Sequence, residues 1–296
     1  MSSTEKPIGY YLIVFFGRVI AVLPYFLQLT LGFSIGWLFF VFGKRRRKIA
    51  AINIDLAFPE LSSKEHEKLV KRHFLAIGMS VVETMMSWFC SERRLRKISS
   101  VKGEDNLQIA RDCGNGVILA GFHFTTIEIA GGILSQQERF TALYRPHSNS
   151  TIESVYSDRR SVTYGGAIER NNIREMIRSL KKGDIVWYAP DQNFGGKNSL
   201  FSPFFGVPAA TNTATSRLAE ITNAKLVPIF FRRLPGLKGY EIEIKPALKN
   251  FPCGDLQKDT DRVNKLIEDF IRRCPEQYLW MHRRYKDRPN GETRFY

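Results

Sequence analysis

A histidine and a glutamate lie five positions apart in "GVILAGFHFTTIEIAGG", residues 116–132, just after a run of apolar residues. His123 and Glu128 have the types needed for general-base catalysis, in which an imidazole takes a proton and a carboxylate fixes its tautomer. Residues five apart on a continuous helix point about 140° away from each other. We therefore expect the pair to meet only if His123 lies in a turn and Glu128 in the first turn of the next helix.

A structural interpretation of the same two residues stays open. His123 could bond a backbone carbonyl in the core, and residues 125–128 match a capping box, in which Glu128 would close a helix N-terminus. A second histidine with an acid five positions later, His282 with Asp287, lies in a basic stretch that no predicted strand precedes. We expect that second pair to belong to a solvated face.

The sequence offers no nucleophile of the protein's own beside His123, and this limits the reactions that His123 could catalyse. The chain has no G-x-S-x-G elbow and no candidate nucleophilic cysteine beside the histidine. The hydroxyl that His123 would activate therefore belongs to a substrate. The sequence thus favours direct transfer of a group to that hydroxyl, without a covalent enzyme intermediate.

Segments of strand and helix character alternate around the pair and predict one α/β domain with a mixed, mostly parallel sheet flanked by helices. A long helix begins at a capping box of Ser62 and Glu65 and continues to Phe89. Ligands of such sheets bind outside the carboxyl ends of the strands, where His123 falls. The expected strands are 116–122, 139–145, 184–190, 225–231 and 240–246, and the expected helices are 125–134, 149–159, 171–182, 211–223 and 260–274.

The N-terminal region predicts a membrane anchor. The run from Val19 to Phe42 carries no charge, and as a helix rising about 1.5 Å per residue it is long enough for a hydrocarbon core of about 30 Å. The basic "GKRRRK" that follows places the remainder on the cytoplasmic side. We expect an anchor over residues 1–44 and a cytoplasm-facing domain over 45–296, although Pro24 could split the run into an interfacial hairpin, and a buried core helix is the alternative.

The net charge of +15 favours polyanionic partners. Nucleic acid is not expected, because no binding motif or basic stripe interleaved with aromatic residues is present. The four cysteines are scattered, without metal-ligand spacing, so we expect reduced thiols and no metal. No cofactor is implied.

Several longer motifs resemble one known family, the late (secondary) acyltransferases of lipid A biosynthesis, of the lauroyl- or palmitoleoyl-transferring type, within the glycerolipid acyltransferase superfamily. The resemblance covers nearly the whole chain. Where the glycerol-phosphate branch carries an "FPEGTRS"-like block, this chain has "APDQNFGGKNS", which disfavours a glycerol-phosphate acceptor. The motifs are "NIDLAFPELS", "GFHFTTIEIAG", "YRPH", "IVWYAPDQNFG", "FSPFFGVPAATNTATSRLA", "VPIFFRR" and "PEQYLWMHRRYKDRP".

The resemblance implies acyl transfer from acyl-carrier protein, which is strongly acidic, to the hydroxyl of a 3-hydroxyacyl chain on a phosphorylated disaccharide lipid. It also implies the bacterial inner membrane, with the catalytic domain on the cytoplasmic side. Two alternatives stay open: a related acyltransferase that uses acyl-CoA and a lysophospholipid or other glycolipid, and a membrane-anchored protein that binds acidic lipids without catalysis.

Candidate binding residues follow from these substrates. Asp191 is expected to bind the acceptor or to play a structural part, and four aromatic residues could line an acyl slot or simply fill the core: Phe122, Trp187, Phe204 and Phe205. Four arginines are candidates for the oxyanion or for the acceptor phosphates, with a surface ion pair as the alternative for each: Arg145, Arg159, Arg160 and Arg170.

Overall fold

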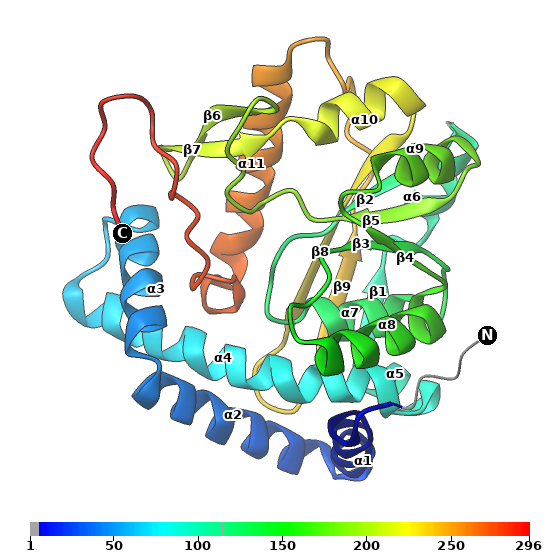
Figure 1. Ribbon diagram of the computed structural model, residues 1–296, viewed down its shortest axis with the longest axis vertical. Helices are drawn as coiled ribbons and strands as arrows, with labels where there is room; N and C mark the ends of the chain where they lie inside the picture. The colour runs from blue at the N-terminus through cyan, green and yellow to red at the C-terminus, as the bar shows by residue number, and fades with distance from the viewer. Residues whose placement is uncertain (1–5, 114) are drawn as a thin grey trace.

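A seven-stranded sheet forms the centre of the computed structural model, which describes residues 6–113 and 115–296 (Figure 1). The strand order is β1–β9–β8–β2–β5–β3–β4, and all neighbours are parallel except β8 and β9. The mostly parallel sheet predicted from the sequence is confirmed. The strands are β1 (Ser99–Lys102), β2 (Val117–Ala120), β3 (Thr141–Tyr144), β4 (Ala167–Glu169), β5 (Ile185–Tyr188), β8 (Lys225–Arg233) and β9 (Tyr240–Ile244).

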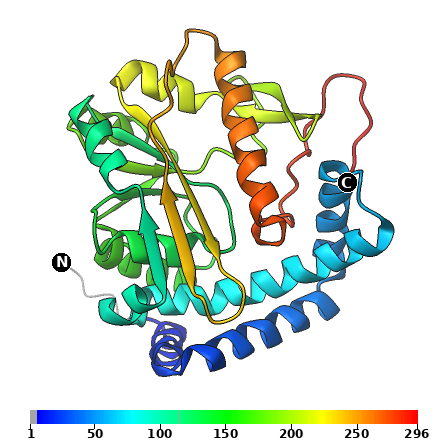
Figure 2. The ribbon, with the colours of Figure 1, turned by 180° about the vertical axis from the view of Figure 1, so that it is seen from behind.

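Helices lie on both faces of this sheet, and further helices run below one end of its strands (Figures 1 and 2). The helices of the first half are α1 (Ile8–Val22), α2 (Tyr25–Phe42), α3 (Lys44–Ala57), α4 (Ser63–Phe89), α5 (Glu92–Lys97) and α6 (Asp105–Asp112). Those of the second half are α7 (Ile127–Leu134), α8 (Ser150–Tyr164), α9 (Ile173–Lys181), α10 (Ala214–Thr222), α11 (Leu256–Arg273) and the short 3₁₀ turn η1 (Pro275–Gln277).

The five strands expected from the sequence are all present, and the described residues form four further strands that the apolar pattern did not indicate. Strands β1 and β4 are short and carry few apolar residues, so no buried run marks them. The antiparallel hairpin of β6 (Ser199–Phe204) and β7 (Val207–Asn212) forms a separate two-stranded sheet beside α11. The capping box of α4 is confirmed, because Ser62 and Glu65 bond each other's backbone N–H groups.

The apolar N-terminal run is two helices and not one. Helix α1 ends at Val22 and α2 begins after Pro24, since proline has no N–H to continue a helical ladder. Of the described helices, α2 alone is long and apolar enough to cross a membrane, with a mean hydropathy of 1.7 and 22% of its residues buried. The expectation of one continuous helix from Val19 is wrong, and an anchoring role for residues 1–44 stays a prediction.

Helix α2 packs along α4 at a very short distance, and the two run side by side under the sheet in both views. A Cβ atom added to Gly78 of α4 would collide with the backbone of Gly32 and Gly36 in α2. A Cβ added to Gly36 would lie 2.6 Å from the Cα of Leu75. Small residues at this spacing let two helix backbones touch, as they do between helices in membranes.

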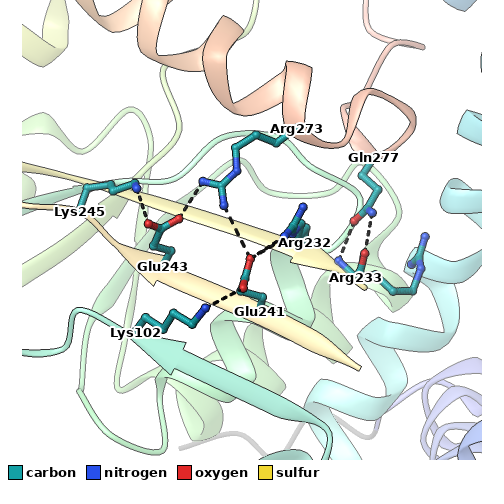
Figure 3. Close-up of polar contacts among 8 residues, drawn as sticks. All are labelled: Lys102, Arg232, Arg233, Glu241, Glu243, Lys245, Arg273 and Gln277. Atoms are coloured by element: carbon teal, nitrogen blue, oxygen red, sulfur yellow. Dashed lines mark hydrogen bonds and ion pairs between the residues drawn. The ribbon is translucent and has the colours of Figure 1, made fainter. Parts of the chain in front are cut away.

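A network of charged side chains fixes the end of the sheet that lies nearest to α4 (Figure 3). Glu241 of β9 accepts from Lys102 and Arg232, and Glu243 accepts from Arg273 of α11 at 2.7 Å. Gln277, in η1, bonds both the N–H and the carbonyl of Arg233, at 2.8 and 2.9 Å. These contacts hold α11 and the segment after it against the C-terminal end of β8.

Candidate active site

His123 lies in a tight turn directly after β2. Gly121 is required in this turn, because a Cβ there would collide with the indole of Trp187. Phe124, the residue directly after His123, packs its ring against Phe231 and Tyr278, both at 5.8 Å between centroids. The turn predicted between the strand and α7 is thus confirmed, and it places the imidazole at the carboxyl edge of the sheet.

The side chain that bonds His123 is Asp191. Strand β5 is the parallel neighbour of β2, so the segments after the two strands meet at the same edge. Nδ1 of His123 donates to Oδ1 of Asp191 at 2.6 Å, and the backbone N–H of His123 donates to Oδ2 at 3.0 Å. Asp191 is completely buried, so this carboxylate holds both the ring and the backbone of His123.

The charge of Asp191 sets the protonation of this pair. Burial by itself lowers the pKa of the His123 imidazole, but the charge of Asp191 and its hydrogen bond outweigh burial and raise that pKa above its usual value. Burial raises the pKa of the Asp191 carboxyl, and the charge of His123 together with its two hydrogen bonds lowers it below the usual range. Asp191 is therefore ionised and stabilises the imidazolium form of its partner.

The second ring nitrogen of His123 is available for chemistry. The side chain is 28% exposed, and within the described residues no group bonds Nε2. Because Nδ1 donates to Asp191, the neutral ring carries its lone pair on Nε2. A core histidine with both nitrogens satisfied, the structural alternative, does not describe this residue.

Glu128 does not contact His123, contrary to the expected pairing. Its carboxylate forms an ion pair with Arg160 of α8 and accepts from the hydroxyl of Tyr164 at 2.6 Å. The capping-box alternative does not hold either, because α7 begins at Ile127 and its N-cap residue, Thr126, makes no side-chain cap bond. The side chain of Glu128 instead extends sideways to Arg160 and Tyr164 of α8.

The ion pair of Glu128 and Arg160 is largely enclosed, with the two side chains 14% and 16% exposed. The Arg160 guanidinium also lies over the ring of Tyr156, 4.9 Å from its centroid. Burial raises the pKa of the Tyr156 hydroxyl to about 12, and the charge of Glu128 acts in the same direction. This pair joins α7 to α8 beside the turn that carries His123.

The other predicted arginines lie apart from this pair. Arg145 and Arg170 are both exposed and directly follow the paired strand ends of β3 and β4, where the N–H of Arg170 bonds the carbonyl of Tyr144 at 2.7 Å. Arg159 instead faces α4, with its guanidinium 5.1 Å from the centroid of Phe89. Arg145 and Arg170 thus form an exposed positive edge, whereas Arg159 packs between helices.

The four aromatic residues considered for an acyl slot lie in the core or against it. Phe122, Trp187 and Phe204 are at most 5% exposed. Phe122 packs against Phe270, and Trp187 against Phe231, with centroids 5.8 and 5.5 Å apart. Phe205 is partly buried against the same core. These four residues therefore fill the core, which was the alternative to lining an acyl slot.

The segment 278–287 contributes contacts that the sequence did not reveal. The N–H of Leu279 donates to the carbonyl of His123 at 2.9 Å, and Nε2 of His282 accepts from the N–H of Asn193 at 3.2 Å. The side chain of Asn193 donates to Asp287 at 2.7 Å. The solvated face expected for His282 and Asp287 is wrong, since both clamp the loop after Asp191.

His282 differs from His123 in its protonation. Burial, with the nearby His123 acting in the same direction, lowers the pKa of His282 to about 4. His282 is therefore neutral when it accepts the bond from Asn193. No signal in "HRRYKD" marks this contact, because it depends on a fold-back of the chain onto a loop 89 positions earlier.

In the part of the chain that the structure describes, no group of three or more His, Cys, Asp and Glu side chains could hold a metal ion. The four cysteines are free, and Cys274 is buried. The candidate site consists of a histidine and a buried aspartate, which suits proton transfer at a substrate hydroxyl.

Comparison with known proteins agrees with the resemblance seen in the motifs. The model of the family described as bacterial lipid A biosynthesis acyltransferase matches residues 2–287. The lipid A biosynthesis palmitoleoyltransferase of Escherichia coli K12 is 40% identical over 93% of this chain and 90% of its own length. The lauroyltransferase of the same organism is 38% identical over 92% and 90%, and its myristoyltransferase 27% over 86% and 79%. The chain therefore belongs to the bacterial lipid A biosynthesis acyltransferase family.

Proposed function

We propose that this protein transfers a fatty acyl group from acyl-carrier protein to the hydroxyl of a 3-hydroxyacyl chain on a lipid A precursor, at the cytoplasmic side of the bacterial inner membrane. The observation that carries the proposal is the pair of His123 and Asp191, which leaves Nε2 unbonded at the carboxyl edge of the sheet. Family membership supports the reaction class.

In the proposed reaction, Nε2 of His123 takes the proton from the acceptor hydroxyl as the oxygen attacks the thioester carbonyl. The tetrahedral intermediate then collapses, its carbon–sulfur bond breaks, and the imidazolium returns the proton to the leaving thiolate. The products are an ester and the free thiol of the carrier. Such general-base catalysis typically contributes about 10² to 10⁴ in rate.

We assign the orienting role to Asp191 in place of Glu128. The 2.6 Å bond to Nδ1 fixes the tautomer that leaves the lone pair on Nε2. The ion pair of Glu128 with Arg160 would instead set where α7, and with it the turn of His123, sits against α8. In this assignment Glu128 is a positioning residue and not a contact of the imidazole.

The charges of the protein fit both proposed substrates. Arg145 and Arg170 are exposed at the strand ends and lack a described ion pair, so they are free to meet the phosphates of the acceptor. Arg160 is already neutralised by Glu128 and is the weaker candidate. The net charge of +15 favours encounter with an acidic carrier protein.

The test is a mass-spectrometric transfer assay with detergent-purified protein. A panel of acyl-carrier-protein thioesters and the matching acyl-CoA thioesters would be offered with a tetra-acylated phosphorylated disaccharide acceptor or a lysophospholipid. We expect wild type to add one acyl group to the disaccharide lipid from the carrier-protein donor, and His123→Ala to lose at least about 10²-fold in rate.

The matched control is His66→Ala, which removes another histidine with an aspartate partner. We expect its transfer rate to stay close to that of wild type. Unchanged transfer by His123→Ala would contradict the assigned base, and acylation of the lysophospholipid alone, from acyl-CoA, would contradict the assigned substrates.

A further inference from the structure

The outer faces of α1 and α2 carry most of the large apolar side chains that the described residues expose. Outside these two helices such residues are scattered, for example Ile109 on α6 and Leu237 in the β8–β9 loop. A patch of this extent marks an interaction surface, since soluble monomers rarely expose one. The apolar face comprises Ile8, Tyr11, Leu12, Phe15, Phe16, Val19, Val22, Phe26, Leu27, Phe33, Trp37, Leu38, Phe39, Val41 and Phe42.

The N-terminal end of α1 is bound to the catalytic domain. Nζ of Lys6 lies 2.8 Å from Oδ2 of Asp158 in α8, and the hydroxyl of Tyr10 donates to the same oxygen at 2.9 Å. Tyr10 also packs with Trp88 of α4 and Val155 of α8 in a small buried cluster. The beginning of the hydrophobic region is therefore on the same side as the domain.

The bend between α1 and α2 is also bound to the domain. The break at Pro24 frees carbonyl groups at the end of α1, and Arg94 of α5 donates to the carbonyls of Ala21 and Leu23. The side chain of Gln28 donates to the carbonyl of Ile20 at 2.8 Å. Protein groups thus satisfy the bend, as they must wherever a helix is interrupted near hydrocarbon.

The two helices lie flat against the domain. Helix α2 follows α4 along the glycines Gly32, Gly36 and Gly78, while α1 is seen end on in both ribbon views and therefore crosses the direction of α2 (Figures 1 and 2). A helix that crossed a bilayer would separate its two ends by the thickness of the membrane. Here the start of α1, the bend and the end of α2 all contact the domain, and its helix α5 carries exposed charges.

Cations flank the apolar face at both ends. Lys44, Arg45, Arg46 and Lys48 are exposed just after α2. Near the bend, α5 presents Arg93, Arg96 and Lys97 around an open groove. Basic residues that border an apolar helix face are the pattern of proteins that lie in the headgroup region of anionic membranes.

We propose that α1 and α2 do not cross the membrane but lie in one leaflet of an anionic phospholipid bilayer, with the apolar face in the acyl-chain layer and the flanking cations on the headgroups. This inference rests on the membrane association proposed above and replaces a spanning anchor. The β8–β9 loop reaches toward α2 in both views, with Leu237 64% exposed, and adds a third contact with the same leaflet.

The first test uses the native sequence with an epitope tag at each end. In inside-out vesicles of the inner membrane, a protease should remove both tags, and in right-side-out spheroplasts it should remove neither. A single-span protein with a tag on the far side serves as the control for sealed vesicles. Protection of the N-terminal tag in inside-out vesicles would overturn the proposal, whether or not the protein transfers acyl groups.

A second test probes the contact of α1 with α8 in the membrane. A Cβ at Gly9 would lie 3.0 Å from Cγ2 of Thr151, so the pair Gly9→Cys and Thr151→Cys has the spacing of a disulfide. With exposed Cys113 and Cys253 replaced by Ser, oxidation of membranes should link this pair. The control pair, Gly9→Cys with Val162→Cys, places the second cysteine about three helical turns farther along α8 and should stay reduced. Equal linkage of both pairs, or linkage of neither, would contradict the contact of α1 with α8 in the membrane.

A third test measures flotation of purified protein with vesicles of phosphatidylglycerol and phosphatidylethanolamine. Phe33→Asp combined with Leu38→Asp should lower the bound fraction by at least about tenfold, because two apolar side chains lose their burial in lipid. The control Ile109→Asp changes an apolar residue away from the face that is more exposed than either and should bind as wild type does. Equal binding by the double variant would refute the assignment of this face, and no binding by wild type would refute the lipid partner.

Discussion

Two pairs of histidine and aspartate are present among the described residues, and they differ in whether the second ring nitrogen of the histidine has a partner. In the first, Nδ1 of His66 lies 2.8 Å from an oxygen of Asp55, and Nε2 donates to the carbonyl of Phe58 at 2.7 Å. Both ring nitrogens are used, and Asp55 is 55% exposed. In the second, Asp191 is buried and the Nε2 of His123 has no bonding partner among the described residues.

The difference shows why the residue types alone do not identify a base. Neither ring nitrogen of His66 is free to meet a substrate, since Nε2 bonds the carbonyl of Phe58 and Nδ1 faces Asp55. The exposed Asp55 is screened by water, whereas the buried Asp191 acts in a low dielectric, where a charge has its full effect on its neighbour. Burial of the carboxylate and freedom of the second nitrogen together distinguish the pair that we propose as catalytic.

The largest expected effect comes from neutralising the buried partner. Asp191→Asn should lower kcat by about 10³-fold or more, as replacing the orienting carboxylate of a catalytic triad with an amide does. The matched change Asp55→Asn should alter kcat less than about twofold, because exposed ion pairs contribute little. Steady-state transfer kinetics of both variants measure this, and similar losses in both would remove the distinction between the pairs.

The next largest effect is on stability and concerns Glu128, the acid near the turn that does not bond His123. Glu128→Gln leaves Arg160 enclosed without a counter-charge and should lower the free energy of unfolding by about 3 kcal/mol. Its control is Glu92→Gln, which breaks an exposed helix pair with Arg96 and should cost at most about 0.5 kcal/mol. Chemical denaturation in detergent gives both values; a Glu128 variant as stable as wild type would show that the ion pair does not hold α7 to α8.

The smallest effect is a shift in pH dependence. The base must be neutral, so kcat/KM should fall as the pH drops through the pKa of His123, which Asp191 raises above its ordinary value of about 6.5. In Asp191→Asn the raising charge is gone while burial still lowers the pKa, so the acid limb of the residual activity should move to lower pH. A pH–rate profile of wild type and variant checks the direction, and a limb that moves upward would exclude His123 as the titrating base.

Much of the fold was predictable because burial leaves a trace in the sequence. Strands β2, β5 and β8 each have an apolar run, and α4 has a capping box. The local sequence therefore indicates each of these elements. Strands β1 and β4 carry no such run, since they lie at the two edges of the sheet where one side is uncovered. Pro24 indicated the break between α1 and α2, but only the structure decides between a kink and two helices.

The site was predictable in part. His123 follows from its place after a buried strand, and the motif suggested Glu128 as its partner because that residue is near in sequence. The partner in the structure lies 68 positions away, and the contact of Asn193 with His282 spans 89. Such pairings depend on how strands neighbour in the sheet and how the chain folds back, and spacing along the sequence carries no record of either.

The segment that bonds the two loops of the site has a consequence for how the protein is made. Tyr278, whose hydroxyl donates to the backbone carbonyl of Asp191, follows that residue by 87 positions. At about 5 to 20 residues per second, the ribosome needs roughly 4 to 17 seconds to add them. During that interval the loops of His123 and Asp191 exist without this contact, so the candidate site is complete only when nearly the whole chain has been made.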